Sequence, residues 1–378
     1  MSRSFRLDIV RSLAILAVIA VHTVQVVRDT VVDLRPASNF EIIFVEILSL
    51  GKYGVELFFA LSGVLLGKIY SNSQAFKLSD FAQNRIRRIY PLWMIFGILS
   101  LFLYLAFDRG WWKGLVNVAE QNGTPSFMVA IATFLFSSWL LFSETTHRAI
   151  AGGWSIEAEV AHYFIFPIVR LFTPARLVAA VSVCGVLQAT LTLWSESNVT
   201  FIDQVSKALL SLSVFSTAPF FFFGLLAASY TSVKAVKGLL NPNLRNLSLL
   251  LLFSPGILLW LGARVPFGWV GEAVVVVVCL IVLAHFITLR AERSRRIWET
   301  ISRHSYSMYF THFWLVSIYV AFDLQVRGSD WWSNLVGNVI FLPLVWFALF
   351  GSVSVISYFV GFPIYRFIER PAMQLRRN

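Results

Sequence analysis

Eleven apolar stretches follow one another along this chain of 378 residues. Most are long enough for a helix to cross the hydrocarbon core of a bilayer, which takes about 20 residues. Because no water reaches that core, a spanning segment must satisfy its own backbone hydrogen bonds, as a helix does. The sequence therefore predicts an all-α polytopic membrane protein. The stretches lie near residues 9–27, 40–70, 90–107, 127–143, 154–172, 177–194, 208–230, 246–262, 268–289, 305–326 and 334–365.

The composition excludes the common soluble classes. Hydrophobic residues make up 57% of the chain and charged residues 13%, whereas soluble domains have about 45–50% apolar and about 25% charged residues. The net charge of +11 would suggest nucleic acid in a soluble protein, but membrane proteins accumulate basic residues in their cytoplasmic loops. We therefore expect neither a soluble enzyme nor a disordered chain nor a nucleic-acid binder.

The basic connections predict the topology. The segments 71–90, 231–245 and 290–303 carry clustered Arg and Lys and should be cytoplasmic, as should both termini. Two cytoplasmic termini require an even number of crossings, so one apolar stretch must not span. The stretch 127–143 is short and is broken by Ser137 and Ser138. We therefore expect a re-entrant or interfacial segment at 127–143 and about ten spans, in a single domain covering residues 1–378.

The first apolar stretch is expected to remain in the membrane as a span. Basic residues precede it, as in a signal peptide, but no convincing small-residue cleavage site follows, and the stretch carries His22. The two cysteines, Cys184 and Cys279, lie inside apolar stretches and form no CxxC or metal-ligand pattern. We therefore expect them to act as small packing side chains, and we expect no metal site.

One face of the first predicted span carries ionisable residues. His22 follows Arg11 by eleven positions, so a helix brings the two to within about 20° of a common face, about 16 Å apart along its axis. Asp8 lies one turn from Arg11 and can pair with it. Ionisable residues at this depth usually face protein or a water-filled cavity. We expect an anion-binding group at the cytoplasmic mouth and a titratable base near mid-membrane, with a hydrogen-bonded packing histidine as the alternative for His22.

Other polar side chains fall within later stretches. Glu159 and His162 are three residues apart and close enough to meet on one face. Ser305, Tyr309 and His312 also share a face at helical spacing, although such groups often only join packed helices. The remaining candidates at or near membrane depth are Glu46, Glu56, Glu272 and His285.

Two arginines precede the third predicted span. Arg85 and Arg88 stand before Pro91, a residue that suits a helix start. At a spacing of three residues, their guanidinium groups point to one side, in a geometry that suits phosphates. A plain cytoplasmic anchor is the alternative interpretation.

Six short blocks, in order from residue 6 to residue 371, resemble the acyltransferase-3 family of integral membrane acyltransferases. The chain, which ends at Asn378, resembles the stand-alone members that lack an extracytoplasmic hydrolase-like domain. The blocks are Arg6-Leu-Asp8-Ile-Val-Arg11 with His22 after it, Gly54-Val-Glu56-Leu-Phe58-Phe59-Ala-Leu-Ser62-Gly63, Arg85-Ile-Arg-Arg88-Ile-Tyr-Pro91, Gly152-Gly153-Trp154-Ser155-Ile-Glu-Ala-Glu159 with Tyr163, Ser305-Tyr306-Ser-Met-Tyr309-Phe-Thr-His312, and Glu369-Arg-Pro371.

The resemblance implies transfer of an acyl group, usually acetyl from cytoplasmic acetyl-CoA, to a hydroxyl of a sugar or glycan. It implies a location in the inner membrane of a bacterium. His22 would be the general base or a transient acyl carrier, supported by Arg11, Asp8 and Glu159. The donor coenzyme would be held by Arg11, Arg85, Arg88, Ser62 and Gly63. The acceptor would meet Gly152, Gly153, Trp154, Ser305, Tyr309 and His312.

Two other classes of function compete with this interpretation. A multi-span transporter of an anionic metabolite or glycan would also use buried ionisable residues and a basic inner mouth. Inverted repeats with paired broken helices would favour a transporter, and the sequence shows no convincing repeat. A membrane scaffold or sensor would leave the shared face of Arg11 and His22 unexplained.

Overall fold

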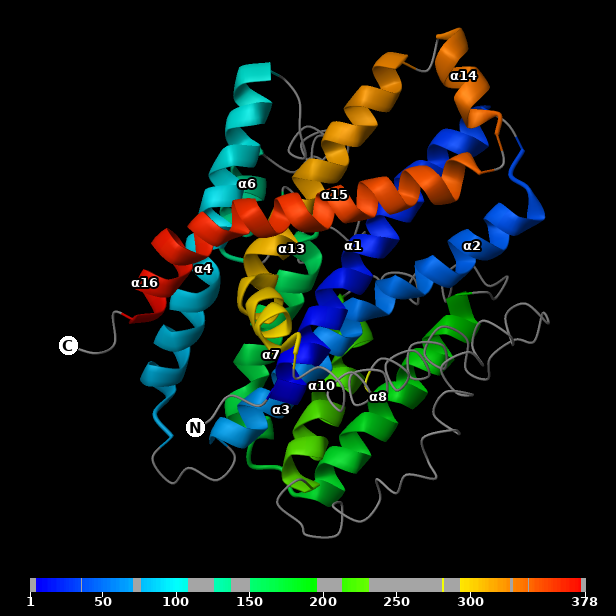
Figure 1. The fold of residues 1–378 in the computed structure, drawn as a ribbon. Helices are drawn as coiled ribbons and strands as arrows, with labels where there is room; N and C mark the ends of the chain where they lie inside the picture. The colour runs from blue at the N-terminus through cyan, green and yellow to red at the C-terminus, as the bar shows by residue number, and fades with distance from the viewer. Residues whose placement is uncertain are drawn as a thin grey trace. The chain divides into compact units, whose positions relative to one another are not determined.

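The computed structural model describes residues 5–34, 36–70, 76–107, 126–136, 150–195, 213–230, 281, 293–326, 329–338 and 340–374. Every regular element within these ranges is helical (Figure 1), which confirms the predicted helical class. Three of the described helices are long and apolar enough to cross a membrane, namely Phe5–Leu34, Leu78–Ala106 and Phe341–Gln374. The number of ten spans stays a prediction. The stretch 246–262, with Glu272, Cys279 and His285, lies outside the described residues.

The chain folds as two compact units, each built from segments that are distant in sequence. The first unit contains Met1–Phe58 and Asn241–Tyr365, and the second contains Phe59–Leu240 and Arg366–Asn378. The boundary falls inside the helix α3 (Gly54–Tyr70). The predicted single domain stays a prediction.

The first unit is built around two parallel helices, α1 (Phe5–Leu34) and α13 (Arg295–Val326). Contacts near both ends set their direction: Ser302 bonds to Asp8, and Tyr319 lies 3.3 Å from the Thr30 hydroxyl. The helix α15 (Phe341–Ile364) crosses both (Figure 1). It runs antiparallel to α13, since residues early in α13 contact residues late in α15. One example is the Cβ position of Gly361, which faces Ser307 at 3.1 Å.

A buried apolar cluster packs the C-terminal half of α1 against its neighbours. It draws on α2 (Asn39–Ser49), α14 (Asp330–Val336) and α15. The two buried tryptophans also satisfy their indole N–H groups, as buried tryptophans usually do. Trp332 donates to Asp323 Oδ1 at 2.9 Å, and Trp346 donates to the Ala20 carbonyl at 3.2 Å. The cluster consists of Val24, Val27, Val31, Val45, Trp332, Val336, Phe341, Leu342 and Trp346.

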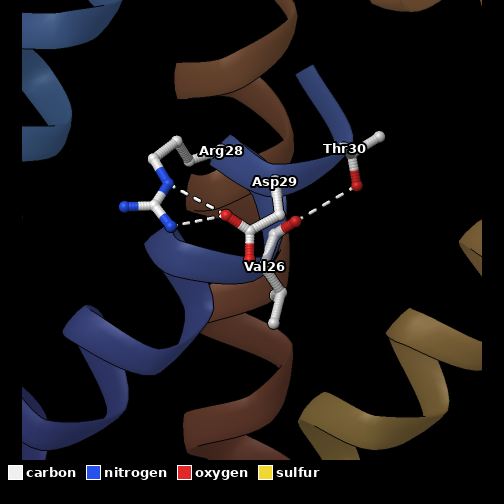
Figure 2. Close-up of polar contacts among 4 residues, drawn as sticks. All are labelled: Val26, Arg28, Asp29 and Thr30. Carbon is white, nitrogen blue, oxygen red and sulfur yellow. Dashed lines mark hydrogen bonds and ion pairs between the residues drawn. The ribbon is translucent and has the colours of Figure 1, made fainter. Parts of the chain in front are cut away.

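The last turns of α1 become polar (Figure 2). Arg28 donates two hydrogen bonds to Asp29 Oδ1, at 2.9 and 2.6 Å, and both side chains are exposed. Thr30 instead donates back to the Val26 carbonyl of its own helix, at 3.1 Å, which hides its hydroxyl. An exposed ion pair stabilises little.

The apolar stretch 40–70 is a broken helix rather than a continuous one. It comprises α2, a 3₁₀ turn η1 (Leu50–Tyr53) and α3. Ser38 caps α2 with Glu41: the Glu41 N–H donates to the Ser38 hydroxyl, and the Ser38 N–H donates to the Glu41 carboxylate. The break lies against α1, because a Cβ on Gly54 would sit 2.6 Å from the Ala14 carbonyl oxygen. Only glycine permits this approach.

In the second unit, α7 (Gly153–Val169) and α8 (Pro174–Ser195) both pack against α10 (Ser213–Tyr230). Figure 1 shows these helices in green, with α8 and α10 side by side. The second half of α3 packs on α10 through glycines. A Cβ on Gly63 would collide with the Phe221 backbone, and a Cβ on Gly224 would collide with the Ala60 backbone. The remaining elements are α4 (Leu78–Phe107), α6 (Ser126–Phe134), the π-helix η4 (Tyr365–Glu369) and α16 (Arg370–Gln374).

Two predictions about the second unit meet the structure differently. Pro91 was expected to start a helix, and this is wrong: α4 begins at Leu78 and contains Pro91 in its interior. The segment 127–143 is described only to residue 136. Its described part is the nine-residue helix α6. At about 14 Å, that helix is too short to cross a core of about 30 Å. A re-entrant path for 137–143 lies outside the described residues and stays a prediction.

Candidate functional site

Near its N-terminus, α1 meets α13 through a buried carboxylate. Asp8 is 2% exposed, and the Ser302 hydroxyl donates to its Oδ1 at 2.7 Å. The Ser12 hydroxyl lies 2.9 Å from both the Asp8 carbonyl and the Trp298 carbonyl. These bonds tie the two helices together at the level of Asp8. Arg11 is half-buried on the same part of α1, and its pairing with Asp8 stays a prediction.

Further along, His22 of α1 meets His312 of α13. Their ring centroids lie 5.4 Å apart, and the Phe313 ring packs on both imidazoles, at 4.6 and 4.1 Å. His22 is half-buried, whereas His312 is fully buried. Since α1 is one continuous helix, Arg11 lies on nearly the same face, about 16 Å away along the axis.

The predicted face of α13 is buried along its length. Ser305, Tyr309 and His312 are each no more than 6% exposed. The Tyr309 ring meets the His312 ring edge-on, at 5.6 Å. The Ser305 hydroxyl donates to the Ser302 carbonyl at 3.0 Å. The structure therefore brings His22, Tyr309 and His312 together. Asp8 meets α13 at Ser302, and Arg11 and Ser305 lie on the same two helices.

A second polar group forms in the second unit around Glu159. Its Oε1 accepts hydrogen bonds from the Tyr163 hydroxyl and, at 3.5 Å, from the Ser62 hydroxyl. The Arg85 guanidinium lies 5.3 Å from the Tyr163 ring centroid. Thus α3, α4 and α7 bring Ser62, Arg85 and Glu159 to one place. We did not predict a role for Tyr163, although its position four residues after Glu159 would have placed it on the same face.

A second guanidinium beside this group was also missed. Arg170, at the end of α7, lies 4.0 Å from the Phe76 ring centroid. Phe76, Phe81 and Phe166 pack together, with ring centroids 5.1 to 6.4 Å apart. Arg85 also lies over this cluster, 5.8 Å from the Phe81 ring. Only the fold brings residue 170 near residue 76, so helical spacing gave no signal.

His162 does not face Glu159, contrary to expectation. Its ring packs between Phe59 and Phe221, at 5.2 and 4.8 Å, and is fully buried. The His162 Nδ1 lies 2.6 Å from the Ala158 carbonyl of its own helix. The imidazole belongs to the packing of α7 against α3 and α10.

The glycines before α7 shape the start of that helix. Gly152 adopts a left-handed backbone with φ of 67°, a conformation that glycine adopts without strain. A Cβ on Gly153 would meet the Trp93 ring at 3.1 Å. Trp154, which follows, is half-buried. The glycines therefore let α7 turn tightly beside Trp93.

Arg88 and Gly63 complete the predicted residues. Arg88 is half-buried on α4, one turn after Arg85. Gly63 lies at the close approach of α3 and α10 described above. Within the described ranges, no three His, Cys, Asp or Glu side chains converge as a metal centre would require.

A comparison with protein families decides the class of the molecule. The family model described as an acyltransferase domain matches residues 5–366, which is nearly the whole chain. The chain belongs to the acyltransferase-3 family. This confirms the resemblance drawn from the six sequence blocks, and it makes the protein a membrane acyltransferase.

Other comparisons add no closer relative for this acyltransferase. Neither the curated proteins nor the solved structures contain a significant match.

Proposed function

We propose that this acyltransferase moves an acetyl group from cytoplasmic acetyl-CoA to a hydroxyl of a sugar or glycan. His22 acts as the general base. The observation that carries the proposal is the environment of His22. It is half-buried on a helix lined by Asp8 and Arg11, and it faces a buried row of polar side chains on α13. A hydroxyl that entered there would meet a neutral imidazole in mostly apolar surroundings.

The proposed reaction is a direct acyl transfer. The acceptor hydroxyl oxygen bonds to the thioester carbonyl carbon while its proton passes to His22. The tetrahedral intermediate then expels the coenzyme A thiolate, which takes that proton back from His22. A positioned base of this kind contributes about 10²–10⁴-fold to the rate. The Tyr309 hydroxyl is the candidate donor to the developing oxyanion.

Recognition of the donor is assigned to the basic group of the second unit. Coenzyme A carries an anionic nucleotide head, and guanidinium groups suit phosphates. Arg85 and Arg88 lie on α4, and Arg170 faces the same aromatic cluster as Arg85. The Phe76 ring beside Arg170 also offers a face on which a base can stack.

Replacement of the base tests the proposal. In protein purified in nanodiscs, His22→Ala should lower kcat for acetyl transfer at least about a hundredfold. The affinity for acetyl-CoA should stay near that of the parent protein. His304→Ala is the control, because His304 is a histidine of α13 that packs against Tyr358, Phe362 and Tyr365 instead of His22.

The result shows whether His22 is the general base. A folded His22→Ala variant that transferred acetyl at the parent rate would exclude His22 as the base. A parent protein that moved no label from radiolabelled acetyl-CoA to any glycan would remove the proposed donor and acceptor.

A further inference from the structure

His312 has a fixed hydrogen-bonding role that its position in the sequence does not reveal. Its Nδ1 lies 3.2 Å from the Met308 carbonyl oxygen, one turn earlier on α13. A carbonyl can only accept, so Nδ1 must carry the hydrogen. In the neutral ring, Nε2 is then a bare acceptor. It cannot donate a hydrogen bond to an oxyanion.

That acceptor nitrogen is buried and unsatisfied. The Nε2 of His312 is shielded from solvent and has no hydrogen-bond partner among the described residues. Leaving a buried acceptor unsatisfied costs about 1–3 kcal/mol. Such a group in a native protein calls for an explanation, and a catalytic role is one of those known. The Nε2 of His304 is buried and unsatisfied in the same way, so the proximity of His22 is what distinguishes His312. A donor is therefore expected to reach this nitrogen at some stage of the catalytic cycle.

A neighbouring group that can supply such a donor is the His22 imidazole, whose ring also hydrogen-bonds the Gln25 side chain. Two imidazoles joined by an N–H···N bond of about 2.9 Å have centroids about 5.2 Å apart. The observed separation is 5.4 Å, with the ring planes tilted by 32°. The Phe313 ring packs on both imidazoles, and the Tyr309 ring meets His312 edge-on. A change in the His22 rotamer that exchanges Gln25 for His312 as hydrogen-bond partner would bring its N–H to the His312 Nε2.

We propose that His312 is a positioning residue for His22: its Nε2 accepts the hydrogen bond that orients the base. This rests on the proposed function. The bond holds one nitrogen of His22 as N–H. The other nitrogen takes the proton of the acceptor hydroxyl when the acceptor displaces the Gln25 side chain. When His22 becomes positively charged, the same bond stabilises the imidazolium. His312 keeps its own hydrogen on Nδ1 throughout, so the proton passes only between hydroxyl, His22 and thiolate.

Two substitutions at His312 distinguish a role in orienting His22 from a role in packing alone. His312→Phe keeps a flat ring but removes the acceptor, whereas His312→Gln keeps an acceptor oxygen. His312→Phe should lower kcat about a hundredfold, with the KM for acetyl-CoA within about twofold of the parent. His312→Gln should recover at least tenfold of that loss. His304→Phe, on the same helix and with its Nδ1 likewise 2.7 Å from the Thr300 carbonyl, should keep the parent kcat.

A spectroscopic measurement tests the same bond without turnover. Nuclear magnetic resonance of the full chain with ¹⁵N-labelled histidine should show His312 neutral and protonated on Nδ1. Its Nε2 signal, assigned by its loss in His312→Gln, should move when His22 is replaced by Ala. A ring protonated on Nε2, or a signal indifferent to that change, would overturn the inference even if a variant failed to fold.

The kinetic outcomes also distinguish the two proposals. If His22→Ala is inactive while His312→Phe works at the parent rate, or if His312→Gln is as slow as His312→Phe, the positioning role fails and the base stands. If the parent protein does not transfer acetyl from acetyl-CoA, the proposed function fails. The ¹⁵N measurement then still decides whether the histidine pair exists.

Discussion

A single carboxyl group shows how this protein accommodates acidic side chains among apolar helices. Glu159 takes hydrogen bonds from Tyr163 and Ser62 on the same oxygen. Removing a carboxylate from water is costly unless such donors replace the water. Asp8 is supported in a similar way by Ser302. These hydroxyl partners explain how acidic side chains fit inside an otherwise apolar chain.

Three neighbouring arginines on α4 allow a matched test of donor binding. Arg85 and Arg88 are one turn apart and share a side of the helix, whereas Arg87 points elsewhere. Arg85→Ala with Arg88→Ala should weaken acetyl-CoA binding at least tenfold, because two phosphate contacts are lost. The remaining affinity should depend on salt, since other charges still act. Isothermal titration calorimetry at two salt concentrations measures both effects.

Arg87→Ala is the control for that pair and should bind acetyl-CoA like the parent protein. If the double variant also bound like the parent, both arginines would be cytoplasmic anchors and would leave the proposed donor site.

Helical spacing predicted which residues share a face, but not which faces meet. The buried row of Ser305, Tyr309 and His312 on α13 was visible in the sequence because spacings of three and four residues define one side of a helix. Arg170 was missed because its role depends on which segments approach the end of α7, whereas the spacing of Tyr163 from Glu159 was visible in the sequence. That approach is a tertiary property.

Element boundaries were the least predictable part of the fold. Apolar content marks where membrane helices lie, but not where they break. The stretch 40–70 breaks at a 3₁₀ turn because Gly51 and Gly54 sit against α1. Pro91 looked like a helix start, yet α4 continues through it for sixteen more residues to Phe107. A membrane helix tolerates an internal proline because neighbouring groups satisfy the carbonyl that it frees.

The glycine contact between α3 and α10 sets a stability prediction. Gly224→Leu should lower the free energy of unfolding by about 1–3 kcal/mol or more, since the added side chain meets the Ala60 backbone. The two helices must then separate. The change is measured as a lower melting temperature in detergent.

Gly351→Leu on α15 is the matched control. A Cβ at Gly351 has no neighbour within 4 Å, so this variant should melt at or above the temperature of the parent. Equal melting of Gly224→Leu and the parent would show that α10 can move away from α3 at no cost.

At the scale of the whole molecule, the topology can be tested from the two ends of the first unit. The α1 helix has 30 residues and is about 45 Å long, which exceeds a core of about 30 Å. Its exposed pair at Arg28 and Asp29 should therefore reach the side opposite the basic start of α13. In a background without Cys184 and Cys279, a membrane-impermeant maleimide should label Asp29→Cys in intact cells.

Arg296→Cys provides the opposite signal in the same background. It lies at the start of α13 and should react only after the membrane is opened. Labelling only of Arg296→Cys in intact cells would mean that the orientation is the reverse of the predicted one. Labelling of both sites would contradict the predicted orientation.

The parallel pairing of α1 with α13 also bears on how the protein is made. The hydrogen bond from Ser302 to Asp8 joins positions 294 residues apart, so α1 enters the bilayer long before the ribosome has finished its partner. During that interval Asp8 and His22 need other polar partners, such as a chaperone, lipid headgroups or the helices made between α1 and α13. A nascent chain that stalls before residue 295 contains His22, the proposed base, but lacks α13, the helix that packs against it. Premature termination should therefore yield fragments without acyltransferase activity rather than a partly active enzyme.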